Sequence, residues 1–550
     1  MPISAESDAP TRDVLVVGAG FSGMYALRKL RDELGMDVHV VERGEDVGGT
    51  WYWNRYPGAR CDAESIFYSY SFDADLQQEW TWTERFATQP EILDYCRHVA
   101  DRFDLRRDIT FGDSVVGAVF DESDDRWTVR LESGGVRRAR FLVTAVGCLA
   151  ASPRVPDVPG LDDFAGATYH TGRWPHEGVD FTGLRVAVIG TGSSGIQVIP
   201  EIAKQAAALT VFQRTPSYSV PARNRVFAED EIARLKREYP ALRAEARQTG
   251  GGSVLPLPPG KAGDLSPEQQ RAELRKRWEL GGPGYMFAFA DSMVDEKANA
   301  VAADFVREQI REIVRDQDVA RLLCPTTYPI GAKRICVDTD YYATYNRDNV
   351  TLVDVSGSPI ERVTPKGLEV GGHVHEVDAI VFATGYDAMT GPLLQLGLRG
   401  VGGRTLAEKW AAGPRTYLGL ATADFPNLFM ITAPGSPSVL TNMVASAEQH
   451  VDWIAAHLEA LRAAGATRVE AEVEAEDAWV EQVNTAASFT LFPQGNSWYI
   501  GANVPGKPRV FMPYVGGYAL YGQQIDEVAR DGYRGFRRNA VLEKGERPGG

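Results

Sequence analysis

Cysteine is scarce in this sequence, and no two cysteines lie close together. The chain has five of them in 550 residues, widely scattered and without a CxxC spacing. This pattern argues against a disulfide framework, a zinc site and a redox-active dithiol. Only His373 and His375 form a close histidine pair, and their surroundings, VGGHVHEVD, are more typical of an exposed hairpin than of a metal site. We therefore expect no metal.

Long apolar runs and an excess of positive charge are missing as well. No stretch is long enough to span a bilayer, and the first residues, MPISAESDAPTRD, lack an apolar core flanked by basic residues. The formal net charge of −16 argues against general affinity for nucleic acid or for an anionic membrane surface. We expect a cytoplasmic protein without a nucleic-acid or membrane partner, and the sequence implies no obligatory protein partner.

A glycine-rich loop near the N-terminus lies inside a complete β-α-β pattern. The apolar run Asp13–Val17 predicts a parallel strand covered on both faces; a helix follows, and Val38–Val41 predicts the next strand, which ends at Glu42. Here the glycines let the backbone approach a pyrophosphate at the helix N-terminus, and Glu42 can accept hydrogen bonds from ribose hydroxyls. The loop residues expected to contact this first dinucleotide are Gly18, Gly20, Phe21, Ser22 and Gly23.

The same pattern recurs between Arg185 and Arg214. The strand VAVI leads into a second glycine-rich loop, a helix and the strand LTVF. Glu42 and Arg214 occupy equivalent places in the two units, each 24 residues after the first glycine of its loop. The residues of the second loop are Gly190, Thr191, Gly192, Ser193, Ser194 and Gly195.

The acid and the arginine predict two different cofactors. An acid would repel a ribose 2′-phosphate, whereas Arg214, helped by Gln213 and Thr215, would pair with it through charge-assisted hydrogen bonds. The hypothesis is that the first unit binds FAD and the second binds NADPH. Two nucleotide-binding units in one chain imply a redox relay.

We expect an α/β fold with two Rossmann-like dinucleotide-binding domains, for FAD and NADP, and a helical insert. A helix start is predicted at Ser266-Pro267-Glu268 inside the insert, and an amphipathic helix from about Ala445 to Ala464. The insert could cover a substrate site or simply stabilise the fold, and the second interpretation is favoured. The expected ranges are 1–150 and 383–550 for the FAD domain, 151–222 and 329–382 for the NADP domain, and 223–328 for the insert.

One segment between the two units narrows the function. Phe164–Pro175, FAGATYHTGRWP, resembles the fingerprint FxGxxxHxxxWP of the Baeyer-Villiger monooxygenases. The segments GGTWYWNRYPGARCD, GTGSSG, FQRTP, DTDYYATYNRDNV, FATGYD, KWAAGPRTYLG and SWYIGANVPGKPRVF look like the phenylacetone and cyclohexanone monooxygenase branch. The resemblance extends from the first strand almost to the C-terminus. The fingerprint residues are Phe164, Gly166, His170, Trp174 and Pro175.

The resemblance implies a flavoprotein in which NADPH reduces FAD and dioxygen adds to the reduced flavin. The resulting C4a-peroxide attacks a ketone, and rearrangement gives an ester or lactone. The resemblance carries the catalytic arginine onto Arg334, which stays charged and offers fixed donors to an oxyanion. In the family, the aspartate that ends RYPGARCD contacts this arginine, so Asp62 would orient Arg334. Asp62 could also cap a helix that begins near Ala63.

The resemblance also implies which other residues contact the two cofactors. It adds Lys333 to Arg214 and Thr215 at the 2′-phosphate and brings Trp498 to the nicotinamide, with ordinary packing as an equal alternative for Trp498. The aromatic loop 49–57 would lie along the flavin and exclude water, with a purely structural cluster as the alternative for Tyr52 and Trp53. The further expected FAD contacts are Gly49, Thr50, Trp51, Asp62, Tyr68, Asn442 and Met443, and Arg334 is a further NADP contact.

The fingerprint and the substrate pocket complete the expectations. We expect His170 to be a hydrogen-bonded hinge and Trp174 its packing anchor, in preference to proton transfer. The pocket residues implied by the resemblance are Cys148, Leu149, Ser438, Val439 and Leu440, which favour an apolar ketone. A flavin monooxygenase that oxygenates nitrogen or sulfur is the alternative function, and a non-catalytic flavin-binding module is a third. A flavin-dependent disulfide reductase is disfavoured because no cysteine pair is present.

Overall fold

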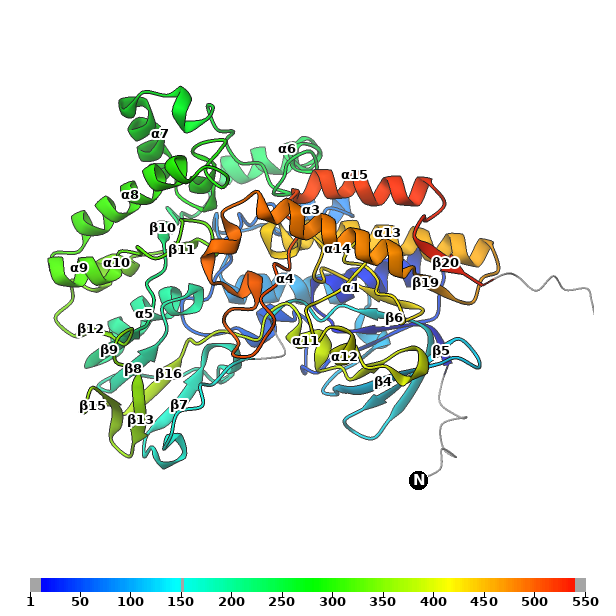
Figure 1. Ribbon diagram of the computed structural model, residues 1–550, viewed down its shortest axis with the longest axis horizontal. Helices are drawn as coiled ribbons and strands as arrows, with labels where there is room; N and C mark the ends of the chain where they lie inside the picture. The colour runs from blue at the N-terminus through cyan, green and yellow to red at the C-terminus, as the bar shows by residue number, and fades with distance from the viewer. Residues whose placement is uncertain (1–10, 150–152, 540–550) are drawn as a thin grey trace, which may run out of the picture.

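The computed structural model describes residues 11–149 and 153–539. Its two large sheets form the left and right halves of the view in Figure 1, with the insert helices above the left half. The expected first domain boundary, between 150 and 151, lies outside the described residues, as do the first ten residues of the N-terminal segment. The domain ranges themselves stay predictions.

The first sheet is built around the N-terminal β-α-β unit. Its strand order is β17-β4-β5-β6-β1-β2-β3, and β18 also pairs with β6. β1 is parallel to β2 and β6, whereas β4 and β5 run antiparallel as a hairpin. The strands are β1 (Thr11–Val17), β2 (Val38–Val41), β3 (Ile109–Thr110), β4 (Val115–Asp121), β5 (Arg126–Leu131), β6 (Val136–Thr144), β17 (Leu398–Arg399) and β18 (Leu428–Met430).

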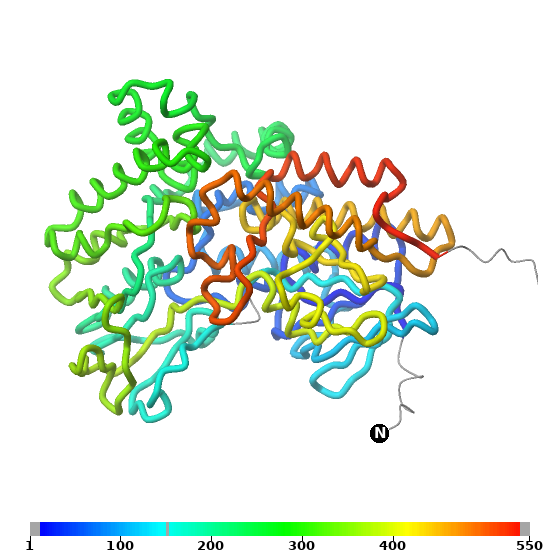
Figure 2. Tube along the Cα trace, in the orientation of Figure 1, coloured from blue at the N-terminus to red at the C-terminus, as the bar shows by residue number. Residues whose placement is uncertain are grey.

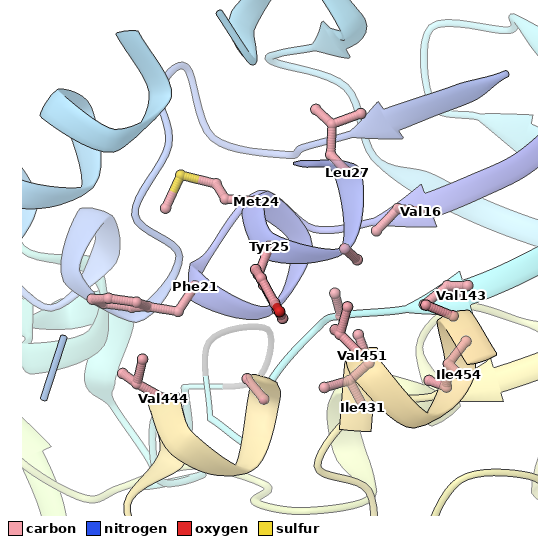
Figure 3. Packing of buried hydrophobic residues seen from close by; sticks show 14 of the residues in the cluster. Val16, Phe21, Met24, Tyr25, Leu27, Val143, Ile431, Val444, Val451 and Ile454 are labelled. Atoms are coloured by element: carbon pink, nitrogen blue, oxygen red, sulfur yellow. The ribbon is translucent and has the colours of Figure 1, made fainter. Parts of the chain in front are cut away.

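The core of this half lies between the sheet and two helices from opposite ends of the chain. α1 (Phe21–Arg28), which continues as the π-helical turn η1 (Lys29–Glu33), packs against α13 (Met443–Ala463). Figure 3 shows Met24 and Leu27 of α1 and Val451 of α13 in one buried cluster with strand residues. The predicted end of α13 is confirmed: Gly465 follows the helix with φ +65°.

The second sheet has the order β12-β9-β8-β16-β7, and each pair of neighbouring strands is parallel. The predicted second β-α-β unit is confirmed as β8, α5 (Ser193–Gln205) and β9. The late strands β12 and β16 complete the sheet. The strands are β7 (Ala167–His170), β8 (Arg185–Ile189), β9 (Ala208–Gln213), β12 (Val350–Asp354) and β16 (Ala379–Phe382).

The histidine pair lies in a small sheet beside this one, formed by β13 (Ile360–Thr364), β14 (Gly367–Val370) and β15 (His373–Glu376). His373 is exposed at the start of β15, so the predicted hairpin is confirmed. No group of residues suited to hold a metal ion occurs within the described ranges.

The insert consists mainly of helices, and the chain enters and leaves it through the paired strands β10 (Ser219–Pro221) and β11 (Cys336–Asp338). Ser266 caps α7 with a capping box, which confirms the predicted helix start. No helix of residues 11–149 and 153–539 has the length and apolar character needed to cross a membrane. The insert helices are α6 (Glu229–Ala246), α7 (Pro267–Leu280), α8 (Glu296–Ile313) and α9 (Gln317–Leu323).

The C-terminal part returns to the junction of the two halves. After α14 (Val473–Ser488) the chain runs through the orange segment in the middle of Figure 2 before α15 (Gly517–Arg530). In this segment the N–H of Leu491 donates to the carbonyl of Met293 in the insert. The side chain of Asn503 donates to the carbonyl of Tyr386, which follows β16. The segment therefore contacts both the insert and the residues that follow β16 of the second sheet.

Candidate active site

A cavity of about 1230 Å³ extends between the two glycine-rich loops. Residues of both β-α-β units, of the loop before β11 and of the C-terminal segment line it. The first loop directly follows β1 and the second directly follows β8, each inside a β-α-β unit of parallel strands, where such folds bind nucleotides. One continuous cavity thus connects the two predicted cofactor sites.

The first loop has the close packing that its glycines predict. Gly18 has φ +103°, and a Cβ on it would lie 2.7 Å from the carbonyl oxygen of Ala145. A Cβ on Gly23 would lie 1.8 Å from the carbonyl oxygen of Gly18, so Gly23 holds the helix against the loop without lining the cavity. This backbone suits a dinucleotide pyrophosphate, since no side chain stands between the loop and a ligand.

Glu42 lines the cavity at the end of β2, but its carboxylate also holds the loop. One oxygen accepts from the N–H of Ala19 at 2.7 Å, and the other accepts from the N–H of Gly44 at 2.6 Å. Burial raises the pKa of Glu42, and these two donors oppose that rise. The residue is therefore a structural clamp of the first loop as well as a possible ribose acceptor.

The aromatic loop divides between cavity and core. Trp51 and Trp53 line the cavity together with Gly49 and Thr50, whereas Tyr52 does not. The hydroxyl of Tyr52 accepts from the N–H of Glu45 at 3.2 Å, so packing accounts for Tyr52. The Trp51 indole donates to the hydroxyl of Tyr68, another lining residue, at 3.2 Å.

The second loop repeats the glycine geometry. Gly190 has φ +108°, and a Cβ on it would lie 2.5 Å from the carbonyl oxygen of Ala383. Gly195 packs on Gly190 and does not line the cavity, whereas Gly192 has open space around its Cβ position. The other loop residues that line the cavity are Thr191, Ser193 and Ser194.

Positive charge gathers beside this second loop. Arg214 is exposed after β9, and both Arg214 and Thr215 line the cavity. The ammonium of Lys333 lies 4.4 Å from the ring centroid of Tyr328. Burial, and then the charge of Arg214, lower the pKa of Lys333. Two neighbouring cations in a cavity wall are suited to an anion such as a phosphate.

The centre of the cavity holds a bidentate ion pair between residues 272 positions apart in the chain. Arg334 Nε and Nη2 each donate to one Asp62 carboxylate oxygen at 2.8 Å, and Nη1 donates to the carbonyl of Val439 at 2.7 Å. All three residues line the cavity. Three fixed bonds therefore set the position and the plane of the guanidinium.

The charges of this pair stabilise each other. Burial alone would raise the pKa of Asp62, but the charge and hydrogen bonds of Arg334 hold that pKa below its usual value. The charge of Asp62 raises the pKa of Arg334 well above its usual value, against the effect of burial. The expected helix cap is wrong: residues 62–72 form turns and bends, and both Asp62 carboxylate oxygens bond Arg334 instead.

An apolar cluster surrounds the ion pair. Cys148, Leu149, Val439 and Met443 line the cavity, and Trp498 lies with them in one cluster. Ser438 and Leu440 do not line the cavity, although Leu440 packs against the same cluster, so their contact with a substrate stays a prediction. The Ser438 hydroxyl donates to the carbonyl of Thr432. An apolar wall beside a fixed arginine suits a substrate with one polar oxygen on an apolar body.

Asn442 has a different position from the one expected. It does not line the cavity; its side chain accepts from the N–H of Val444 at 3.0 Å and so caps α13. Its amide nitrogen donates to the carbonyl of Phe67 at 2.6 Å. Its contact with the flavin stays a prediction.

The fingerprint lies at the edge of the second sheet. His170, at the end of β7, is 5% exposed, and its Nδ1 accepts from the N–H of Gly172 at 2.9 Å. Its Nε2 donates to the carbonyl of Arg154 at 3.2 Å. Burial lowers the pKa of His170 to about 4, so the ring is neutral at physiological pH. Neither His170 nor the rest of the fingerprint lines the cavity.

The other fingerprint residues pack against the second sheet and its surroundings. Trp174 is buried against Tyr169 and Phe181. A Cβ on Gly166 would lie 2.2 Å from the carbonyl oxygen of Asp378, so a larger residue would separate the segment from β16. Phe164 packs on a buried cluster of the second sheet, and Pro175 is half-buried.

Several residues that join the two halves were missed by the sequence analysis. The Tyr386 hydroxyl donates to the side chain of Asn54 in the aromatic loop, and Asn503 binds the Tyr386 carbonyl. Tyr499 is buried next to Arg334; burial raises its pKa to about 12, although the charge of Arg334 opposes this. The motifs FATGYD, TWYWN and SWYIGANVPG contained these residues, but pairing across 332 positions leaves no local signal.

Comparison with known proteins agrees with this geometry. Residues 11–229 match the family described as flavin-binding monooxygenase-like. The chain is 42% identical to an acetone monooxygenase (methyl acetate-forming) of Gordonia sp. strain TY-5, over 96% of this chain and 99% of that protein. It is 44% identical to a Baeyer-Villiger monooxygenase of Pseudooceanicola batsensis, over 97% of both chains.

A further relative and a solved structure are also similar to this chain over nearly its whole length. The chain is 41% identical to phenazine N-monooxygenase PhzNO1 of Lysobacter antibioticus, over 96% of this chain and 98% of that protein. The structure of an oxidized steroid monooxygenase bound to NADP superposes with a TM-score of 0.92 at 52% identity. That superposition covers 96% of this chain and all of the other.

Proposed function

The chain belongs to the Baeyer-Villiger monooxygenases, and from this premise we propose that it converts an apolar ketone into an ester or lactone with NADPH and dioxygen. The observation that carries the proposal is the Arg334–Asp62 pair in the cavity between the two glycine-rich loops. When bound, FAD supplies the oxygen chemistry and NADPH the electrons. The cofactors are thus FAD and NADPH, and the glycine geometry of both loops fits them.

Arg334 is proposed as the residue that stabilises negative charge on oxygen during the reaction. Its bonds to Asp62 and Val439 use Nε and one hydrogen on each terminal nitrogen, so further N–H groups remain for a ligand. Because its pKa is raised, the guanidinium stays charged at every working pH. A charged donor held in a fixed position lowers the energy of an oxyanion without reorganising.

Asp62 is proposed to act through Arg334. Its two carboxylate oxygens hold the guanidinium plane, and its low pKa keeps the pair ionised at neutral pH. The apolar residues Cys148, Leu149 and Val439 border the site and offer a ketone an apolar surface beside the arginine.

The second loop is proposed to select NADPH over NADH. Arg214, Thr215 and Lys333 face the same part of the cavity wall, and their charge suits a ribose 2′-phosphate. Trp498 lines the cavity and is proposed to lie on the nicotinamide side. The fingerprint histidine, which has both ring nitrogens engaged with backbone groups, is proposed as a hinge without a proton-transfer role.

The domain ranges expected from the sequence are proposed as the working division of the chain, with residues 151–222 and 329–382 forming the NADP domain. They agree with a second sheet whose strands come from 167–213 and 350–382. A cytoplasmic location stays a prediction.

Replacement of Arg334 tests the function. We expect Arg334→Ala to retain FAD and to be reduced by NADPH, but to form ester at least about a hundredfold more slowly, as for loss of one oxyanion donor. Products from a cyclic ketone are measured by mass spectrometry beside NADPH consumption. Arg307→Ala is the matched control, since Arg307 bonds a carbonyl and a hydroxyl outside the cavity. Near-normal ester formation by Arg334→Ala would contradict the assigned role.

The alternative function is heteroatom oxygenation, which the phenazine relative keeps in view. A ketone, a thioether and a tertiary amine are offered side by side to the wild-type enzyme. Ester or lactone from the ketone supports the proposal. Oxygenated sulfur or nitrogen products, with no product from any of a panel of linear, cyclic, aromatic and steroidal ketones, would overturn it. Absence of ketone-stimulated NADPH consumption with every substrate would favour the non-catalytic module.

A further inference from the structure

We propose that the helical insert sets the position of Arg334, and that the buried side chain of Asn299 is the positioning residue. This proposal rests on the role given to Arg334 above. It assigns a function to residues 223–328 that goes beyond stabilising the fold.

Residues 329–334, here called the Arg334 loop, connect the insert to β11. The N–H of Ala332 donates to the carbonyl of Pro329 at 3.1 Å, so the loop begins with a tight turn. Ile330 and Ala332 are fully buried. Lys333 and Arg334 follow this turn and line the cavity. Any shift of the turn is therefore passed to both cations.

Asn299 holds the turn at two points. It lies in the first turn of α8 and is 3% exposed. Its Oδ1 accepts from the N–H of Ile330 at 3.0 Å, and its Nδ2 donates to the carbonyl of Ile330 at 2.8 Å. The second hydrogen of Nδ2 binds the carbonyl of Ser292 at 2.8 Å. One side chain thus fixes the Arg334 loop, helix α8 and the segment before it.

A second set of contacts presses on the same turn from the insert. Gly331 has φ +86°, and a Cβ on it would lie 2.5 Å from Cε of Met286 and 2.6 Å from Sδ of Met293. Both methionines belong to the insert. On the opposite side, a Cβ on Gly495 would lie 2.2 Å from the carbonyl oxygen of Ala332. The turn is therefore enclosed between the insert and the segment that leads to Trp498.

These contacts explain why a residue outside the cavity can affect the chemistry. Asn299 does not line the cavity, but Ile330 is only four residues before Arg334. The guanidinium must meet Asp62 and the Val439 carbonyl, which both belong to other parts of the chain. A displacement of about 1 Å at a reacting group can lower a rate by about a hundredfold. Holding the turn thus holds the guanidinium.

Two variants test the proposal from the two sides of the turn. Asn299→Ala removes all three hydrogen bonds, and Gly331→Ala puts a methyl group against the two methionines at an unfavourable φ. We expect both to retain FAD and to reduce it within about threefold of wild type at saturating NADPH, because a shifted Lys333 would act on the KM for NADPH. The ester formed per NADPH consumed should fall at least about tenfold, with hydrogen peroxide released in its place.

Each variant has a matched control. Asn346→Ala removes a similar clamp, in which the side chain accepts from Arg315 N–H and donates to the Ile313 carbonyl at the far end of α8. Gly372→Ala strains a glycine of φ +73° in open space. Both controls are expected to lower the melting temperature without changing the ester formed per NADPH, because that ratio does not depend on how much enzyme is folded.

The outcomes separate the proposal from a merely structural role. Loss of coupling in Asn299→Ala or Gly331→Ala, with normal coupling in the controls, supports it; if one variant fails to fold, the other decides. Normal coupling in the folded variants, or equal loss in Asn346→Ala, overturns it. Failure of the proposed function is recognised separately, since the wild-type enzyme would then form no ester from any ketone. Failure of the Arg334 role is recognised by normal ester formation in Arg334→Ala.

Discussion

The two glycine-rich units share one backbone design but differ in the charged residue after their second strand. Glu42 follows β2, is 5% exposed and accepts from the N–H of Ala19 in the first loop and from the N–H of Gly44. Arg214 follows β9 at the equivalent place, is exposed and lines the cavity beside Lys333. Residues at equivalent positions of the two units thus have different roles. Glu42 holds the backbone of its loop, and Arg214 faces the cavity.

Reversing the charge at Arg214 should give the largest effect. Arg214→Glu replaces a charge-assisted bond, worth about 1.5–3 kcal/mol, by repulsion. We expect kcat/KM for NADPH to fall at least about a hundredfold, with kcat/KM for NADH changed less than about threefold. Steady-state kinetics with both nucleotides measure this. Arg321→Glu, on the exposed face of α9, is the control. Equal losses with the two nucleotides would refute the assignment of Arg214.

Replacement of Glu42 should weaken FAD binding and leave the nucleotide preference unchanged. Glu42→Gln leaves one carbonyl oxygen for two backbone donors, and an unpaired buried donor costs about 1–3 kcal/mol. We therefore expect the dissociation constant of FAD to rise roughly ten- to a hundredfold. The preference for NADPH should not change. Flavin titration of the apo-protein measures the first quantity, with the exposed Glu45→Gln as control. A changed nucleotide preference with unchanged FAD affinity would break the comparison.

Local patterns were sufficient to predict both units. The apolar runs before each glycine loop, the capping box at Ser266 and the glycine after α13 depend on residues close in sequence. Their φ values and hydrogen bonds follow from short-range rules, so the strands and helices they define lie near the predicted positions. The acid and the arginine could be compared for the same reason.

Contacts between distant segments could not be predicted in this way. The bond of Arg334 to the Val439 carbonyl and the bond between Tyr386 and Asn54 join segments that meet only after both sheets have formed. Asp62 was expected to cap a helix, but its carboxylate pairs with Arg334, because a charged, bidentate guanidinium competes better than a backbone N–H. The Asp62 contact itself came from family resemblance and not from spacing.

Asp338 in β11 is a second buried acid, and it can be compared with Glu42 because it also accepts hydrogen bonds from its surroundings. Asp338 accepts from the Ser219 hydroxyl and from the N–H of Tyr341, and burial raises its pKa to about 6 from 3.8. Between these pH values the folded state binds more protons than the unfolded state. Asp338 therefore costs stability progressively as pH rises from about 4 to 6, and fully above 6.

Asp338→Asn should remove this dependence. Relative to wild type, the variant should gain about 2–3 kcal/mol between pH 4 and pH 7.5. Thermal unfolding at the two pH values measures the gain, and FAD affinity should stay constant. The neighbouring Asp340→Asn is the control, since Asp340 is exposed and already has a left-handed backbone that asparagine tolerates. A gain that is equal at both pH values would contradict the raised pKa.

The smallest effect is expected at His170, which lies between the two units compared above. Its Nδ1 accepts from Gly172 and its Nε2 donates to Arg154, and a pKa of about 4 keeps the ring neutral. Asparagine can both accept and donate, so His170→Asn should lower the ester formed per NADPH by only about threefold, and alanine by more. FAD content should be normal in both variants, and the pH profile of the rate should match wild type between pH 6 and pH 9, because no proton leaves the ring there. The exposed His176→Asn is the control. A shifted pH profile would make His170 a proton donor, and production of apo-protein would place its role in the first unit instead of at the hinge.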